Sequence, residues 1–195
     1  QAHFNDLWLI ATLPALNINI NNFPAIKHYL KQFGRRLYQT GETFVDADGN
    51  YTRSRKKTGN KWYETQDQIS YHQDFEKEKI VFQEMVQSPI FAYDANAGYI
   101  CLDTARIITG ENLKYLVGIL NSKLFFYGVK TFYGGGCLGS EGVRMKHTFF
   151  QEFSVPKPLD SNSNPIIALV DRILSAKAAD PAADGYGIYL ILWFG

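Results

Sequence analysis

This 195-residue chain has little cysteine, no long apolar run and no strong net charge of either sign. Its two cysteines, Cys101 and Cys137, are too few for a disulfide framework and form no CxxC pair, which argues against a structural zinc site. The chain contains no run of about 18 apolar residues, so the sequence predicts no membrane-spanning helix. Its first residues do not have the pattern of a signal peptide. We therefore expect a cytoplasmic protein with no membrane partner.

The motifs of common enzymes are absent as well. The four histidines show no HExxH spacing, no GxSxG motif occurs, and the glycine-rich segment 134–142 lacks the GKS or GKT of a phosphate-binding loop. None of the thirteen lysines has an acidic residue two positions before it, as a common nuclease motif requires. Neither NPPY/NPPF nor FxGxG, the signatures of adenine methylation and adenosylmethionine binding, is found. We expect no metal site, no bound cofactor and no complete active site in this chain.

The apolar pattern is that of a folded protein, with 46% hydrophobic and 20% charged residues. Residues 7–20 are expected to be extended, and residues 41–61 to form a long loop or hairpin tip around the turn signal at 48–50. The expected helices are one that begins at Pro24 and extends to Leu37, one over 113–120, a short one capped by Ser122, and one from Pro165 to about Lys177. The expected strands are 80–82, 90–93, 98–102 and an edge strand at 153–155.

Separate helices and strands of this kind indicate an α+β domain rather than a regular βαβ array. We expect a mixed, mostly antiparallel twisted sheet with three or four helices in a domain over residues 1–178. Residues 179–195 form an apolar tail that could add a strand, pack against a partner or result from an altered reading frame.

Charge is unevenly distributed although the formal net charge is only +1. Residues 27–63 carry a net charge of +6, residues 64–84 carry −4, and residues 123–157 carry +3. Five cations and three aromatic residues lie within positions 51–63, a composition that suits phosphate contacts and stacking on bases. The plainer alternative is a set of solvated loops without a partner. For the charged cluster 76–79 we expect this plainer case, a solvated entry to a strand.

Three motifs together resemble a known family. They are Thr58–Glu64 (TGNKWYE), Phe75–Val81 (FEKEKIV) and Tyr115–Leu124 (YLVGILNSKL), and Pro14–Ile18 (PALNI) precedes them. In order and spacing they are similar to the TaqI-like C-terminal specificity domain, the target recognition domain of adenine-specific DNA methyltransferases and type IIG restriction-modification enzymes. The resemblance covers roughly residues 7–177.

The resemblance implies an α+β domain that recognises duplex DNA beside a methyltransferase domain, which flips the adenine and catalyses the reaction. That catalytic domain, with its S-adenosylmethionine, would precede residue 1 in the same polypeptide, and the parent protein could also carry an endonuclease. The alternative is a protein-interaction module in which the aromatic surface and the tail dock on a methyltransferase or nuclease partner.

We call residues 51–63 the basic run. The residues expected to contact DNA have cationic, amide or aromatic side chains near this run or near the glycine-rich segment. They are Arg53, Arg55, Lys56, Lys57, Lys61, Tyr63, Gln66, Gln68, Lys130, Tyr133, Arg144 and Lys146. The cations of the basic run are expected mainly on phosphates. Any of the three arginines could read guanine, and either glutamine could read adenine. Core packing is the expected role of Trp62.

Overall fold

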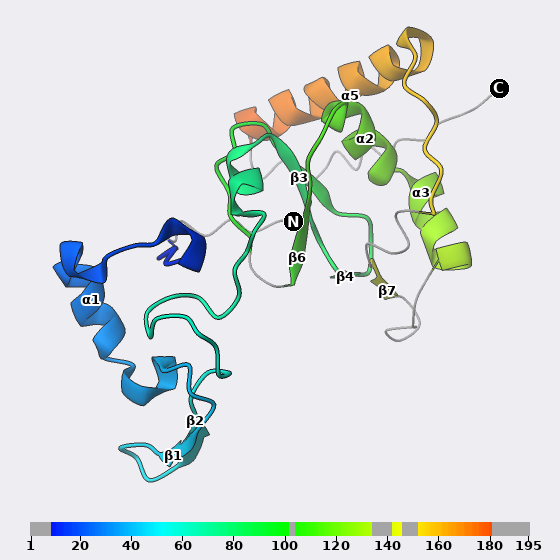
Figure 1. The fold of residues 1–195 in the computed structure, drawn as a ribbon. Coiled ribbons are helices and arrows are strands. Elements are labelled where there is room, and N and C mark those ends of the chain that lie inside the picture. The colour runs from blue at the N-terminus through cyan, green and yellow to red at the C-terminus, as the bar shows by residue number, and fades with distance from the viewer. Residues whose placement is uncertain (1–8, 102–103, 134–141, 146–151, 181–195) are drawn as a thin grey trace. The chain divides into compact units, whose positions relative to one another are not determined.

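The computed structural model describes residues 9–101, 104–133, 142–145 and 152–180. The described residues form two compact units, a smaller one over 9–72 and a larger one from residue 73 onward. Helices occur together with antiparallel strand pairs, which confirms the predicted α+β class (Figure 1). The predicted domain boundary at residue 178 stays a prediction, and the tail from 181 lies outside the described residues.

The smaller unit combines short helical turns with one β-hairpin. The predicted helix does begin at Pro24, but it ends at Lys31 instead of continuing to Leu37, and Gly34 follows with a φ of +52° that an α-helix cannot contain. Its elements are the 3₁₀ turns η1 (Pro14–Leu16) and η2 (Ile20–Asn22), helix α1 (Pro24–Lys31), the 3₁₀ turn η3 (Gly34–Leu37), and strands β1 (Thr43–Val45) and β2 (Tyr51–Arg53). The prediction of extended structure over 7–20 is therefore wrong at both 3₁₀ turns, whereas the hairpin within 41–61 is confirmed.

The larger unit is built around a three-stranded antiparallel sheet in the order β5-β3-β6, with a separate pair formed by β4 and β7. Its strands are β3 (Lys79–Gln83), β4 (Met85–Val86), β5 (Phe91–Asp94), β6 (Ala105–Ile108) and β7 (Val143–Arg144). Its helical elements are the 3₁₀ turn η4 (His72–Glu76), helices α2 (Leu113–Leu120) and α3 (Lys123–Gly128), the π-helical turn η5 (Val129–Tyr133), and helix α5 (Asp160–Ala179).

Two predicted strands are wrong. Of the strand predicted at 98–102, the described residues 98–101 form none, because the backbone N–H groups of Gly98 and Tyr99 donate to the Asp94 carboxylate, at 3.1 Å each, instead of entering a ladder. The third strand of the sheet is β6 instead. The edge strand predicted at 153–155 is irregular chain.

The predicted helix at 165–177 is longer than expected. Helix α5 begins at Asp160, because the Asn162 side chain accepts the Leu159 N–H at 2.8 Å and so caps the helix before Pro165 is reached. The other two predicted helices are confirmed as α2 and α3, and the Ser122 hydroxyl accepts the N–H of Phe125 at 3.1 Å as the predicted cap.

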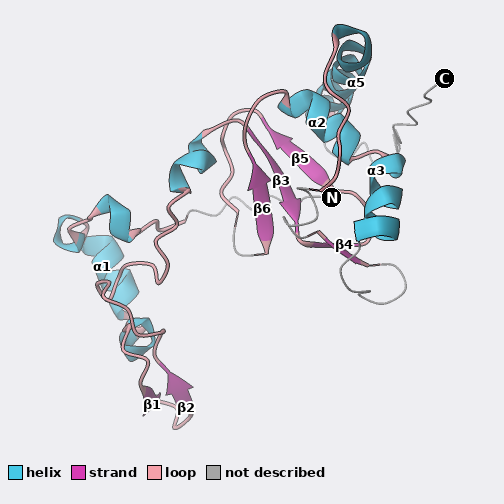
Figure 2. Cartoon of the chain, turned by 45° about the vertical axis from the view of Figure 1, so that its right-hand side comes forward, coloured by secondary structure: helices cyan, strands magenta, loops and turns pink. Residues whose placement is uncertain are grey.

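Helix α2 is the centre of the larger unit because both of its faces are covered. Leu113, Val117 and Leu120 pack with Ile80 and Phe82 of the central strand. The other face, with Tyr115 and Ile119, contacts Ile166 of α5, so α2 lies between the sheet and α5 (Figure 2). A helix that is apolar on two faces is expected at such a position, and its one charged residue, Lys114, pairs with Asp171 of α5 at 2.7 Å.

Gly118 lets α2 and α5 approach each other closely. A Cβ atom at this position would lie 2.5 Å from Cγ2 of Ile166 and 3.2 Å from Cγ2 of Val170. Both neighbours are β-branched and have little rotamer freedom to move away. The glycine in the YLVGIL motif therefore has a packing role.

We expect Gly118→Ala to lower the free energy of unfolding by about 1–2 kcal/mol, because overpacking outweighs the gain in helix propensity. Urea denaturation followed by circular dichroism measures this effect. Gly59→Ala is the matched control, since a Cβ atom there meets nothing within 4 Å. Equal stability of the two variants would contradict the close packing of these helices.

Candidate nucleic-acid interface

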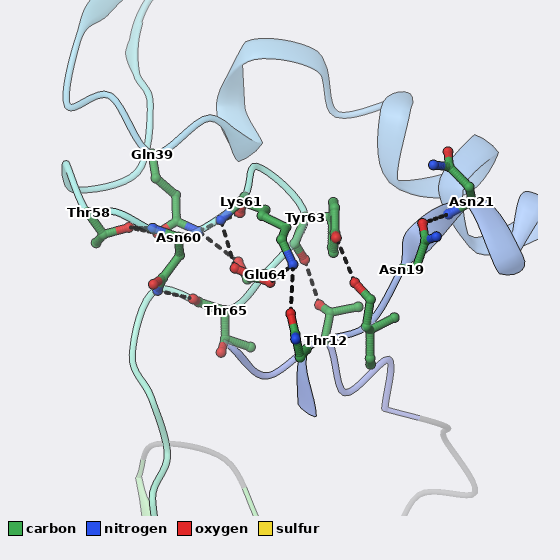
Figure 3. Close-up of polar contacts among 12 residues, drawn as sticks. Thr12, Asn19, Asn21, Gln39, Thr58, Asn60, Lys61, Tyr63, Glu64 and Thr65 are labelled. Carbon is green, nitrogen blue, oxygen red and sulfur yellow. Dashed lines mark hydrogen bonds and ion pairs between the residues drawn. The ribbon is translucent and has the colours of Figure 1, made fainter. Parts of the chain in front are cut away.

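Residues 61–64 form a tight turn that Glu64 closes from both ends. The Glu64 N–H donates to the Lys61 carbonyl at 2.9 Å, and the Glu64 carboxylate accepts the Lys61 N–H at 2.7 Å (Figure 3). The same carboxylate pairs with the Lys61 ammonium at 3.1 Å, and this hydrogen bond raises the pKa of Lys61. The ammonium group of Lys61 is therefore paired with a carboxylate within its own turn.

The buried amide of Gln39 holds this turn against the preceding loop. Its Nε2 donates to the carbonyls of Lys61 (3.1 Å) and Glu64 (2.9 Å), and its Oε1 accepts the Thr58 hydroxyl (Figure 3). The Asn60 amide donates to the carbonyls of Thr65 and Gln66, at 3.0 and 3.2 Å. The polar residues of the TGNKWYE motif thus satisfy the backbone of their own loop.

Tyr63 ties the loop to the beginning of the unit. Its ring is buried, and its hydroxyl donates to the Ile18 carbonyl at 2.7 Å (Figure 3). The Thr12 hydroxyl donates to the Tyr63 carbonyl at 2.6 Å, and the Thr65 N–H donates to the Thr12 carbonyl at 2.9 Å. Trp62 packs edge-to-face against Tyr63 and is half-buried. Both aromatic residues serve packing in this arrangement.

Arg55 is half-buried and donates to three backbone carbonyls. Its Nε donates to Leu37 at 2.8 Å, one terminal nitrogen donates to Glu64 at 2.8 Å, and the other donates to Trp62 at 2.6 Å. Burial lowers the pKa of this guanidinium. The side chain is therefore a structural bridge between η3 and the 61–64 turn.

Arg53, Lys56 and Lys57 are the exposed cations of the basic run that have no carboxylate partner among the described residues, and we call them the free basic group. Lys61 is exposed as well, but it pairs with Glu64. Arg53 Nε donates to the Gly41 carbonyl at 3.0 Å, and the Lys56 N–H donates to the Gln66 side chain at 3.0 Å. Within the described residues, no carboxylate lies within ion-pair distance of any of the three side chains. Their charges are available to an external anion.

Two arginines outside the basic run do have carboxylate partners. Arg35 pairs with Glu42 at 3.6 Å, and Arg36 pairs with Asp46 at 2.7 Å. Of the two predicted glutamines, Gln68 is exposed, whereas Gln66 is half-buried and accepts the Lys56 N–H. The structure thus brings eight predicted site residues into one unit but separates the free basic group from those engaged internally.

The four remaining predicted residues belong to the segment of the larger unit around the glycine-rich loop. Lys130 is exposed on η5, and Tyr133 ends that turn. Arg144 on β7 pairs with Glu84 at 2.6 Å. Lys146 and most of the glycine-rich segment lie outside the described residues. A shared surface between these residues and the free basic group stays a prediction.

Sequence reasoning missed the buried ion pair at the start of β3. Lys79 was expected in a solvated strand entry, but its side chain is 0% exposed and its Nζ lies 2.5 Å from the Asp94 carboxylate. The expectation is wrong for Lys79 because its partner lies fifteen residues later, on the neighbouring strand. The FEKEKIV motif offers no local sign of that partner.

The described part of the chain has neither a metal-binding cluster nor a membrane-spanning helix. It contains no group of three or more His, Cys, Asp or Glu side chains arranged to hold a metal ion. None of its helices has both the length and the apolar character required to cross a membrane.

The comparison with protein families places the chain in the class of specificity domains, the non-catalytic parts of restriction-modification proteins that recognise DNA sequence. Within this class, the model of the TaqI-like C-terminal specificity domain matches residues 27–135, more than half of the chain, and the chain belongs to this family. No curated protein matches the sequence significantly. The match confirms the resemblance carried by the three motifs.

Proposed function

We propose that the chain is the duplex-DNA recognition module of a type II restriction-modification enzyme or an adenine-N6 DNA methyltransferase. It positions a catalytic domain, located before residue 1 in the same polypeptide and supplied with S-adenosylmethionine, on its target. The proposal extends the DNA recognition that the family implies. The observation that carries it is the free basic group on a loop whose backbone is fixed by internal hydrogen bonds.

Charge supports this function beyond the single loop. Residues 6–72 hold nine Lys and Arg against six acids, a net charge of +3, whereas residues 73–195 hold eleven against thirteen, a net charge of −2. Positive charge is therefore concentrated on the smaller unit, where it would attract the phosphate backbone. A loop that is already ordered loses little conformational entropy when it binds.

The contacts divide the predicted site residues by role. Lys56 and Lys57 would neutralise phosphates, and Arg53 is the cation with a planar group available for a base. Arg55, Lys61 and Tyr63 would act indirectly, by holding the loop in shape.

The proposal predicts a salt-dependent affinity for duplex DNA that the two lysines control. We expect the double variant Lys56→Gln/Lys57→Gln to make the slope of log K against log salt less negative by about 1.8. Between 50 and 200 mM salt, the Kd of the parent chain would then rise about 12-fold more than the Kd of the variant. Fluorescence anisotropy with a labelled random-sequence duplex measures both slopes.

The matched control is Lys157→Gln/Lys177→Gln, which removes two exposed lysines of the larger unit. It should keep the slope of the parent chain. If the 56/57 variant keeps that slope too, or if the parent chain does not bind duplex DNA, the proposal fails.

A second candidate is a protein-interaction module that docks on a methyltransferase or nuclease partner. Exposed aromatic side chains on and around α1 favour it: Phe23, Tyr29, Phe33 and Tyr38 are each 44–48% exposed. Such a patch is typical of a protein contact. Light scattering with and without residues 185–195 tests it, because a docking surface that includes the tail should drive self-association of the whole chain only when the tail is present.

A further inference from the structure

The hairpin of β1 and β2 presents one fully exposed face. The register pairs Thr43 with Arg53 and Val45 with Tyr51, so these four side chains lie on the same side of the ribbon. All four are exposed, and Tyr51, at 85%, is the most exposed large apolar residue of the described chain. Figure 1 shows the hairpin at one end of the smaller unit.

The opposite face of the ribbon is attached to its own unit. Phe44 is half-buried there, and the Arg35 guanidinium lies 4.8 Å from the centre of its ring. The unit therefore covers one face of the two strands and leaves the other unpartnered. Tyr51 and Arg53 on this uncovered face are therefore exposed to solvent and not covered by the core of their own unit.

The turn that joins the strands is already formed. The Asp46 carboxylate accepts the N–H groups of Asp48 (3.1 Å) and Asn50 (2.9 Å) and pairs with Arg36 at 2.7 Å. The Asn50 amide, followed by the Arg36 guanidinium, lowers the pKa of Asp46. The two acids that flank β1, Asp46 and Glu42, each pair with an arginine of the same unit, so they do not repel phosphate strongly.

Arg53 is held so that its recognition groups stay available. Its Nε–H donates to the Gly41 carbonyl at 3.0 Å, so the N–H groups of both terminal nitrogens remain available for a base. Gly41 has a φ of +72°, a conformation that favours glycine at the residue whose carbonyl accepts this hydrogen bond. The terminal pair of an arginine matches O6 and N7 of guanine in the major groove.

We propose that the β1–β2 ribbon enters the DNA major groove and reads the base sequence, with Arg53 bonded to a guanine and Tyr51 packed on a neighbouring base edge. The inference rests on the proposed function and names its reading element. A two-stranded ribbon fits the width of the major groove. Lys56 and Lys57, which lie three and four residues after the end of β2, are then placed to contact the phosphates that border the groove.

The test begins with selection of duplexes from a random-sequence pool by the full chain. We expect the parent chain to enrich a motif that contains a guanine, and Arg53→Ala to lose the preference at that one base pair by about 5- to 150-fold. Tyr51→Ala should weaken the preference at an adjacent position. Arg172→Ala, an exposed arginine of α5, is the matched control and should select the same motif as the parent chain.

Base analogues then identify the groove. Replacing the selected guanine by 7-deazaguanine removes the N7 acceptor in the major groove, and replacing it by inosine removes the amino group in the minor groove. The 7-deaza duplex should weaken binding of the parent chain but not of Arg53→Ala, and inosine should affect neither. Sensitivity to inosine alone, or an unchanged motif with Arg53→Ala, overturns the inference while salt-dependent binding still supports the proposed function. Failure of the parent chain to bind duplex DNA overturns both.

Discussion

Replacing Lys79 by Met should lower the free energy of unfolding at pH 7 by about 3–5 kcal/mol, because it leaves a buried carboxylate without its cation. Lys79 is 0% exposed and Asp94 is 6% exposed, with 2.5 Å between the ammonium nitrogen and the carboxylate oxygen. The same ammonium donates to the Phe75 carbonyl at 2.8 Å. The pair joins the central strand β3 to β5, so the whole larger unit depends on it.

The effect of this substitution should depend on pH in a defined direction. Burial by itself would raise the pKa of Asp94, but Lys79 and the amides of Gly98 and Tyr99 outweigh burial and lower it. A carboxyl with a lowered pKa stabilises the fold above its unfolded pKa of about 3.9 and loses that contribution as the pH falls through the folded pKa. In Lys79→Met, burial makes the carboxylate unfavourable, so this variant gains relative stability as Asp94 is protonated.

The difference in unfolding free energy between the parent chain and Lys79→Met should therefore be largest near pH 7 and smaller near pH 4. Urea denaturation at both pH values, followed by circular dichroism, measures it. Lys77→Met is the matched control, since Lys77 is 61% exposed and its pair with Asp74 is superficial. A pH-independent difference, or one no larger than that of Lys77→Met, would contradict a stabilising role for the buried pair.

The sequence predicted local structure well where one segment contains all the necessary signals. The apolar stripe of α2, the Ser122 cap of α3 and the turn residues of the β1–β2 hairpin are of this kind. It failed where a distant or competing group decided the outcome. Residues 98–102 have strand-forming side chains, but the Asp94 carboxylate takes the backbone N–H groups that a strand would need.

The candidate site shows the same limit. The basic run is visible in the sequence, but neighbouring cations in it have different roles. Arg53 and Arg55 are two positions apart, and Arg55 is internal because the Leu37 carbonyl, eighteen residues earlier, lies beside it. Gln39 is even more distant in sequence, because it lies 22 residues before Lys61 and 25 before Glu64 of the turn that it holds. Only the three-dimensional contacts separate the cations that build the loop from those available to DNA.

Replacing Arg55 by Met should destabilise the smaller unit by about 2–4 kcal/mol while the adjacent Lys56→Met changes stability by less than about 0.5 kcal/mol. Loss of the guanidinium removes the donor that the carbonyls of Leu37, Trp62 and Glu64 share, and of these the Glu64 carbonyl keeps the amide of Gln39. Lys56 donates only through its backbone N–H, which methionine retains. Amide hydrogen exchange over residues 37–66 measures the local effect in the full chain.

The two variants should weaken DNA binding for different reasons, which hydrogen exchange and the salt slope together distinguish. Lys56→Met should make the salt slope of duplex binding less negative by about 0.9 and leave hydrogen exchange unchanged, because it removes one phosphate contact. Arg55→Met should accelerate exchange throughout the loop, and its loss of affinity should match the fraction of molecules in which the loop has opened. If Arg55→Met exchanges as slowly as the parent chain yet loses affinity and slope, Arg55 contacts DNA directly and the structural role assigned to it is wrong.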